Sequence, residues 1–176
     1  MGRADAARAA ALPYAAVMAA SSHPAVDRVV ADLADRGVEA RVRWLDDAVT
    51  TAQLAADALG VDVGQIANSL VFLLDDEPVL VLTSGAHRVD TTWLGEQLDG
   101  RITRASKEVV KDATGQVIGG VAPLGHPAPV RTFVDVHLGT YDEVWAAAGH
   151  ARTVFPTSYA ELVRVTGGTP TAVEPG

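Results

Sequence analysis

Two small polar residues, Asn68 and Ser69, stand at the start of the most strand-like run in the chain, within the stretch GQIANSLVFLL of residues 64–74. The second half of this stretch is apolar at nearly every position, which predicts a strand buried on both faces. Small polar residues at the mouth of such a strand can form a turn, or they can present hydrogen-bonding groups in an active site. The local sequence leaves both interpretations open.

A second candidate site is the segment Gly125-His126-Pro127-Ala128-Pro129, which lies in the longest run of turn-forming residues. A glycine lets a ligand approach its backbone N–H group closely, because no Cβ stands in the way. The two prolines stiffen the segment that follows the glycine. A rigid loop with one exposed donor could hold a carbonyl group or a developing oxyanion. A plain surface loop would fit the same residues.

The remaining residues offer less chemistry. The histidines form no HxxxH pair, and no carboxylate joins them at metal-ligand spacing, so no metal site is expected. The chain has no cysteine, which excludes a disulfide framework and a cysteine nucleophile. Ser84 and His87 lie close in sequence, but without a GxSxG motif they are interpreted as a turn after a strand. The five histidines are His23, His87, His126, His137 and His150.

Length and charge restrict the possible functions. The 176 residues fit one domain, and the formal net charge is −8. A protein that coats long nucleic acid is normally basic, so only contact with the end of an RNA stays open. No apolar run reaches the roughly 18 residues that span a membrane. Asp5 and Pro13 interrupt the signal-peptide pattern of the first twenty residues, so a cytoplasmic location is expected.

A group of basic residues follows in the second half of the chain, at or near helical spacing and with acidic residues between them. This pattern is more typical of a solvated helix face than of a nucleic-acid patch. The four residues are Arg101, Arg104, Lys107 and Lys111.

Apolar spacing and turn residues predict the elements that must position these candidates. Helices are predicted over 24–36, 51–59, 91–98, 106–113 and 158–165. Strands are predicted over 38–45, 70–74, 79–83, 130–136, 143–148 and 153–155. The loop Asp75-Asp76-Glu77-Pro78 is expected to join two of these strands in a hairpin.

The order of these elements predicts the fold class. Helices come singly and strands also come in hairpins, which favours an α/β domain of the α+β type. We expect a single domain whose mixed, mostly antiparallel, strongly curved and barrel-like sheet is flanked by helices. Residues 1–22 are expected to form a loosely ordered or helical lead, 23–168 the domain, and 169–176 a tail.

Four segments occur in an order that resembles the YbaK/EbsC family, whose members are relatives of the editing domain inserted in bacterial prolyl-tRNA synthetases. The segments are AQLAADALGVDVGQIANSLVF, VLVLTSGAHRVD, IGGVAPLGHPAPVRTFVDVHL and YDEVWAAAG. The resemblance runs from about Thr51 to Gly168 and implies a curved mixed sheet, near a barrel. It also implies hydrolysis of the ester between a wrong, small amino acid and the 3′ end of a tRNA such as tRNA-Pro. Water would be the nucleophile, the substrate's ribose hydroxyl would assist, and no cofactor would be used.

The resemblance also implies site residues. The GxxxP loop of the family matches Gly125 to Pro129, so Gly125 is expected to donate its backbone N–H to the substrate. Asn68 stands where the family pattern I-V-K-[ST]-L-V-F has a functional lysine. An amide brings two donors and one acceptor but no charge. A serine common in some members is replaced by Ala147. The expected catalytic residues are Asn68 and Gly125, and the expected substrate-binding residues are Ser69, His126, Pro127, Pro129, Ala147, Ala148 and Gly149.

The preferred hypothesis is a trans-editing aminoacyl-tRNA deacylase of a subtype without the lysine, in which Asn68 orients the substrate and Gly125 holds the carbonyl. The first alternative is a non-hydrolytic binding module of the same fold that recognises an acceptor end, an amino acid or a nucleotide. A different hydrolase or an interaction role is the second. The expected partner is the acceptor end of an aminoacyl-tRNA, with prolyl-tRNA synthetase as a further candidate. No membrane or DNA partner is expected, and the protein is expected to be a monomer or weak dimer.

Overall fold

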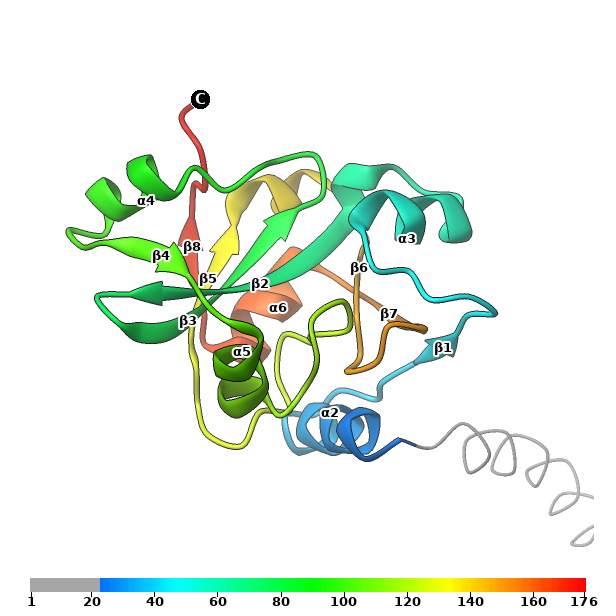
Figure 1. Cartoon of the computed structure of the whole chain (residues 1–176). Coiled ribbons are helices and arrows are strands. Elements are labelled where there is room, and N and C mark those ends of the chain that lie inside the picture. Colours follow the sequence, from blue (N-terminus) through cyan, green and yellow to red (C-terminus); the bar gives the residue numbers. More distant parts are fainter. Residues whose placement is uncertain (1–22) are drawn as a thin grey trace, which may run out of the picture.

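The computed structural model describes residues 23–176, so the lead predicted over residues 1–22 lies outside the described part. A mixed sheet of eight strands runs through the molecule, with helices on both faces (Figure 1). Its strand order is β1-β7-β6-β2-β3-β5-β8, and β4 pairs with β2 beside this path. Four of the pairings are antiparallel and three are parallel. The predicted single α/β domain with a mixed, curved sheet is confirmed, although the eight strands do not close into a barrel.

The helices lie within one residue of their predicted bounds, because each begins at a capping side chain. The capping residues are His23, Thr51, Asp90, Ser106 and Ser158. The helices are α2 (Pro24–Asp35), α3 (Ala52–Leu59), α4 (Thr91–Gln97), α5 (Lys107–Thr114) and α6 (Tyr159–Thr166), with the 3-10 turns η1 (Val63–Gln65) and η2 (Val136–Thr140). The strands are β1 (Arg43–Trp44), β2 (Ile66–Leu74), β3 (Glu77–Ser84), β4 (Ile102–Arg104), β5 (Arg131–Asp135), β6 (Val144–Ala146), β7 (Thr153–Thr157) and β8 (Thr169–Thr171).

The hairpin between β2 and β3 turns on two residues. Asp75 and Asp76 have φ angles of 48° and 69°, so both central positions of the turn are left-handed, as a type I′ turn requires. Glu77 and Pro78 were predicted as loop but belong to β3. The expected four-residue loop is therefore wrong by two residues, because a type I′ turn needs only two.

The alternation of backbone groups along β2 explains how Pro78 fits into a strand. The carbonyl of Ile66 accepts a hydrogen bond from the N–H of Gly85 at 2.8 Å, so the even-numbered residues of β2 direct their backbone groups towards β3. Leu73, which lies opposite Pro78, is odd-numbered, and its backbone groups face away from β3. Proline lacks an N–H group, but this pair requires none.

Helices α2, α5 and α6 pack on one face of the sheet, and α3 and α4 pack on the other (Figure 1). The larger core cluster joins Leu80 and Leu82 of β3 to Val29 of α2 and Leu162 of α6. On the other face, Leu94 of α4 packs against Val81 and Phe133, and α3 packs against Ile66. Strand β3 has neighbours on both edges, β2 and β5, and forms the centre of both core layers.

Three short segments differ from the prediction. The strand expected over 38–45 is regular only at β1, and β4 and β8 were missed. Arg104 lies in β4, so its predicted place on a helix face is wrong. Strands of three residues are too short to show a period in the sequence, and only their pairing partners define them. Strand β8 forms part of the expected tail and pairs with β5, and Val173 beyond it is 1% exposed.

Candidate functional site

Strand β2 carries a stretch of four residues, 68–71, that is paired on one edge only. Strand β3 pairs with residues 67–74 along the first edge. On the second edge, β6 pairs with residues 66 and 67, and β4 pairs with residues 72–74. Because the even-numbered residues face β3, the backbone N–H and C=O groups of Ser69 and Val71 face this open edge. The sheet therefore presents backbone donors and acceptors at a point between two short strands.

A cavity of about 380 Å³ lies at this open edge. Its walls come from β2, β4, α3, α5, β6, β7 and the loop around residue 119, and most of the lining side chains are apolar. Asn68 and Ser69 both line it, although successive side chains of a strand point to opposite faces of the sheet. The volume is in the range of small-molecule sites, which are typically apolar with a few placed polar groups.

The polar groups of the cavity wall are few. Arg104 is the one residue with a charged side chain among the described residues that line it. Two buried polar atoms of lining residues, Ser69 Oγ and Trp145 Nε1, have no hydrogen-bond partner within the described part of the chain. Buried polar atoms without partners are rare and often occur where a protein functions. The wall therefore combines apolar surface with uncompensated hydrogen-bonding capacity.

The loop after α5 closes one side of the cavity, and Gln116 holds this loop in place. Gln116 is 1% exposed. Its side-chain oxygen accepts from the N–H of Ala122 at 2.7 Å, and its amide nitrogen donates to the carbonyl of Leu124 at 3.3 Å. The Gln116 side chain thus holds the loop backbone at both Ala122 and Leu124.

Two glycines let the same loop pack directly on the backbone behind it. A Cβ atom on Gly120 would lie 2.5 Å from the carbonyl carbon of His150 and 2.7 Å from the nitrogen of Ala151. Gly119 has a φ angle of 98°, and it packs against Thr50. Only glycine permits this approach, so the loop can reach the edge of the sheet and line the cavity through Ile118, Gly119 and Val121.

Of the predicted binding residues Ala147, Ala148 and Gly149, the first lines the cavity and the other two lie behind its wall. Ala147 lines the cavity together with Asn68 and Ser69. Ala148 is fully buried, and its N–H donates to Thr153 Oγ1 at 3.1 Å. Gly149 packs against the backbone of Ala25, with its added Cβ position 3.1 Å from the carbonyl carbon. Ala148 and Gly149 therefore support the wall from behind.

The Gly125 segment does not reach the Asn68 cavity. Residues 125–129 line a second hollow of about 400 Å³ beside α2. The N–H of Gly125 donates to Asp32 Oδ2 of that helix at 2.9 Å, and a Cβ on Gly125 would lie 2.9 Å from Val29 Cα. The backbone donor that the sequence suggested for a substrate is used within the protein, and Asn68 and Gly125 lie in different hollows.

The sequence contains a second segment with the same G-x-x-x-P spacing, Gly119 to Pro123, which the sequence analysis did not single out. Gly119 and Val121 of this segment line the Asn68 cavity. The signal was available, because the spacing occurs twice within residues 119–129. Which copy faces the cavity depends on the packing of the loop between α2 and the sheet.

The predicted binding residue His126 and the histidine of the predicted turn, His87, do not line the cavity. His126 Nε2 lies 2.9 Å from the carbonyl of Ala122, and burial lowers the pKa of this imidazole below its usual value. His87 Nδ1 lies 3.0 Å from Asp135 Oδ2, whereas Ser84 Oγ donates to the carbonyl of Gly64 at 2.7 Å. The N–H of His87 donates to the Ser84 carbonyl, which confirms the predicted turn after the strand.

A family model described as an aminoacyl-tRNA editing domain matches residues 46–165, more than half of the chain. The chain belongs to the aminoacyl-tRNA editing domain family. The matched range contains the whole of β2, the loop after α5 and β6, and so it includes the open edge and most of the cavity wall. This match confirms the family resemblance that the sequence motifs indicated.

Individual relatives agree with this assignment. A crystal structure described as that of a proposed trans-editing enzyme for prolyl tRNA synthetase superimposes with a TM-score of 0.82 at 37% identity, covering 88% of this chain and 99% of that one. A proline–tRNA ligase of Bacillus licheniformis is 31% identical over 124 residues, which are 68% of this chain and 21% of the ligase. The uncharacterised protein YwhH of Bacillus subtilis is 28% identical over 64% of this chain and 72% of its own length. The chain thus spans about a fifth of that ligase.

Among residues 23–176, no group of three or more histidine, cysteine, aspartate or glutamate residues is arranged to hold a metal ion. Within the same range, no helix has the length and apolar character needed to cross a membrane.

We predict that Gln116→Ala lowers the free energy of unfolding by about 2–3 kcal/mol, because it removes two hydrogen bonds and leaves a small cavity. The measurement is urea unfolding followed by circular dichroism. Gln97→Ala is the matched control, since Gln97 is exposed on α4. A Gln116→Ala protein as stable as the Gln97→Ala protein would show that the loop after α5 is held by other contacts.

Proposed function

We propose that this protein hydrolyses the ester of a small, wrongly attached amino acid on a tRNA, as a trans-editing enzyme. The observation that carries the proposal is the cavity at the open edge of β2, which lies within the part of the chain that matches the editing domain. The proposed substrate is a mischarged tRNA-Pro or a similar tRNA. The description of the 37% identical crystal structure supports this choice of substrate.

The chemistry proposed for this cavity is acyl transfer to water. Water attacks the carbonyl carbon of the ester, the bond to the ribose 3′ oxygen breaks, and that oxygen takes up a proton. A tetrahedral oxyanion forms on the way, and fixed hydrogen-bond donors in a poorly hydrated site stabilise such an ion. The N–H groups of Ser69 and Val71 at the open edge and the side-chain amide of Asn68 are the proposed donors.

The proton path is proposed to run through the substrate. The described residues that line the cavity include no aspartate, glutamate, histidine or lysine that could act as general base. A hydroxyl of the substrate's ribose would lie next to the reacting ester and could pass the proton from water to the leaving oxygen. In this scheme the protein supplies position and polarisation, with Asn68 as the residue in contact with the reacting atoms.

The size of the amino acid follows from the walls. Ala67, Ala146 and Ala147 line the cavity near Asn68, and the bulky ring of Trp145 stands beside them. The neighbouring Ala148 donates its N–H to Thr153 Oγ1, and Gly149 packs on the backbone of Ala25, so the wall has little freedom to recede. These contacts support a small aliphatic or small polar side chain rather than an aromatic one.

The direct test is a deacylation assay with a panel of mischarged tRNAs, in which release of the amino acid is followed over time. We expect release above spontaneous ester loss for at least one small amino acid. Tight binding of charged tRNA without any release would support the alternative, a binding module of the same fold. That alternative is kept because the described residues that line the cavity include no titratable base.

We predict that Asn68→Ala lowers kcat/KM for deacylation by about tenfold to a hundredfold, because one donor to the developing oxyanion is lost. The measurement is the initial rate with the best tRNA of the panel. Gln97→Ala is again the control, since it removes an exposed amide on α4, which contributes no residue to the lining. Equal rates for the Asn68→Ala protein and the wild type would deny Asn68 a part in the chemistry.

For Gly125 we propose a supporting role, in which the segment holds the loop after α5 against α2. Gly125→Ala is predicted to lower the free energy of unfolding by about 2–4 kcal/mol, because the new methyl group meets Val29 and the φ angle of 80° disfavours a side chain.

The matched control for this change is Gly37→Ala. Gly37 has a φ angle of 81° but nothing within 4 Å of its added Cβ, so it reports the backbone strain alone. Stability is measured by urea unfolding, and deacylation is measured on the folded protein. Loss of activity in a Gly125→Ala protein that is as stable as the Gly37→Ala protein would instead indicate direct contact between Gly125 and the substrate.

A further inference from the structure

The electrostatics of the cavity depend on one side chain. Of the described residues that line it, only Arg104 is charged, and the lining includes no carboxylate. The protein as a whole carries a formal net charge of −8. Among the described lining residues, a single cation at the edge of an otherwise neutral cavity therefore favours the approach of an anionic ligand at this point of the acidic protein.

The guanidinium group of Arg104 is available for a ligand. Arg104 is exposed, and no hydrogen bond or ion pair with residues 23–176 engages its side chain. Other arginines near the cavity are engaged. The Arg43 guanidinium lies 5.9 Å from the ring centre of Trp145, and Arg152 Nε donates to the carbonyl of Leu45 at 2.7 Å.

The register of the sheet places Arg104 on the same face of the sheet as Asn68. Arg104 of β4 lies opposite Phe72 of β2, and side chains of directly opposed residues share a face. Asn68 and Phe72 are both even-numbered residues of β2, so their side chains also share a face. Four residues of a strand span roughly 13 Å, which separates Arg104 from Asn68 along the cavity.

We propose that Arg104 binds a backbone phosphate of the acceptor end of the tRNA while the ester lies beside Asn68. The proposal deepens the proposed function and rests on it for the identity of the ligand. A guanidinium group can donate two parallel hydrogen bonds to phosphate oxygens, which fixes both position and orientation. Arg104 acts as a positioning residue, because its contact is with a part of the substrate that does not react.

The position of Arg104 is suited to this task because the ester and the nearest backbone phosphates of an RNA end are separate groups. A cation at the ester would contact the reacting atoms themselves. Arg104 lies on β4, the strand next to β2, where it can hold the RNA that carries the ester. The apolar part of the cavity is then left for the amino acid. Phosphate contacts of this kind set register and carry no sequence information.

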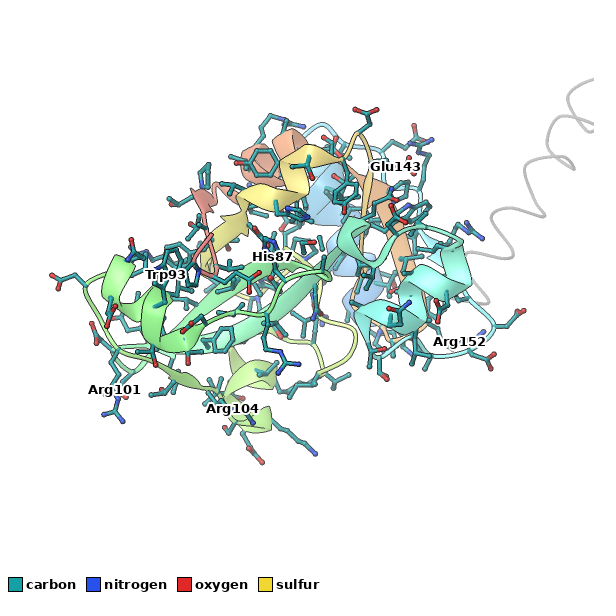
Figure 2. All side chains as sticks on the ribbon, turned by 90° about the horizontal axis from the view of Figure 1, so that it is seen from above. His87, Trp93, Arg101, Arg104, Glu143 and Arg152 are labelled. Carbon is teal, nitrogen blue, oxygen red and sulfur yellow. The ribbon has the colours of Figure 1, made fainter. Side chains whose placement is uncertain are left out.

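Arg101 provides the matched control, three residues before Arg104 in the chain. Arg101 precedes β4, is also exposed, and has no side-chain partner within residues 23–176, but it lines two hollows beside Asp75 and not the Asn68 cavity. Figure 2 shows both arginine side chains on the same side of the molecule. Removing either one changes the net charge equally, so the two changes differ in location.

The experiment compares Arg104→Gln, Arg104→Lys and Arg101→Gln with the wild type. Fluorescence anisotropy measures binding of an uncharged single-stranded RNA that ends in CCA, at several salt concentrations. We expect Arg104→Gln to weaken binding about fivefold to tenfold and to reduce the slope of log Kd against log salt by about 0.7, the value for one phosphate contact on a single strand. Arg104→Lys should keep the slope, and Arg101→Gln should stay within about twofold of the wild type.

The deacylation assay provides the second readout. Arg104→Gln should raise KM by a similar factor and leave kcat nearly unchanged, because the lost contact does not change in the transition state. RNA binding that depends on Arg104 without any deacylation would refute the proposed hydrolysis and keep the phosphate contact. No RNA binding by the wild type, an unchanged salt slope in Arg104→Gln, or an equal loss in Arg101→Gln would overturn the assignment of Arg104.

Discussion

The pairing of strand β2 is the constraint on which the rest of this structure depends. One edge of β2 is paired with β3 along the hairpin, whereas the other edge is shared by β6 and β4, which are both too short to meet. Between them, the backbone groups of Ser69 and Val71 face no paired strand within residues 23–176, at the centre of a folded domain. Unpaired backbone groups are costly when they are buried, so this arrangement requires either solvent or a ligand at the open edge.

The loop after α5 converts this open edge into a cavity. Gln116 holds the loop by two hydrogen bonds, and Gly120 lets its backbone lie against the turn between β6 and β7. The Gly125 segment continues behind the loop and is tied to α2 through Asp32. Of the two segments whose residues suggested a site, the one with Asn68 therefore lines the cavity, and the Gly125 segment supports the loop from outside it.

The composition of the cavity indicates how it would work. Among residues 23–176, its walls are mainly apolar, with an amide at Asn68, two buried polar atoms without partners and a single charged side chain, Arg104. A site of this kind cannot supply a strong acid or base, but it can orient an ester and polarise its carbonyl. The proposed roles follow from this composition. Uncharged donors such as Asn68 lie near the reacting group, and Arg104 lies where the anionic part of the substrate would enter.

The sequence by itself determined the elements, because local signals define them: five capped helices, the long hairpin and the polar pair Asn68-Ser69 at its start. The order of its motifs also indicated the editing-domain family. Only the tertiary structure decided which G-x-x-x-P segment lines the cavity, since Gly119 and Gly125 have the same local spacing but pack against different partners. It also decided that β4 exists and that Arg104 lies beside the cavity, because a three-residue strand is defined by its partner. Strand pairing and loop packing depend on residues far apart in the sequence, so local patterns do not predict them. The cavity at the edge of β2 is formed by these two features.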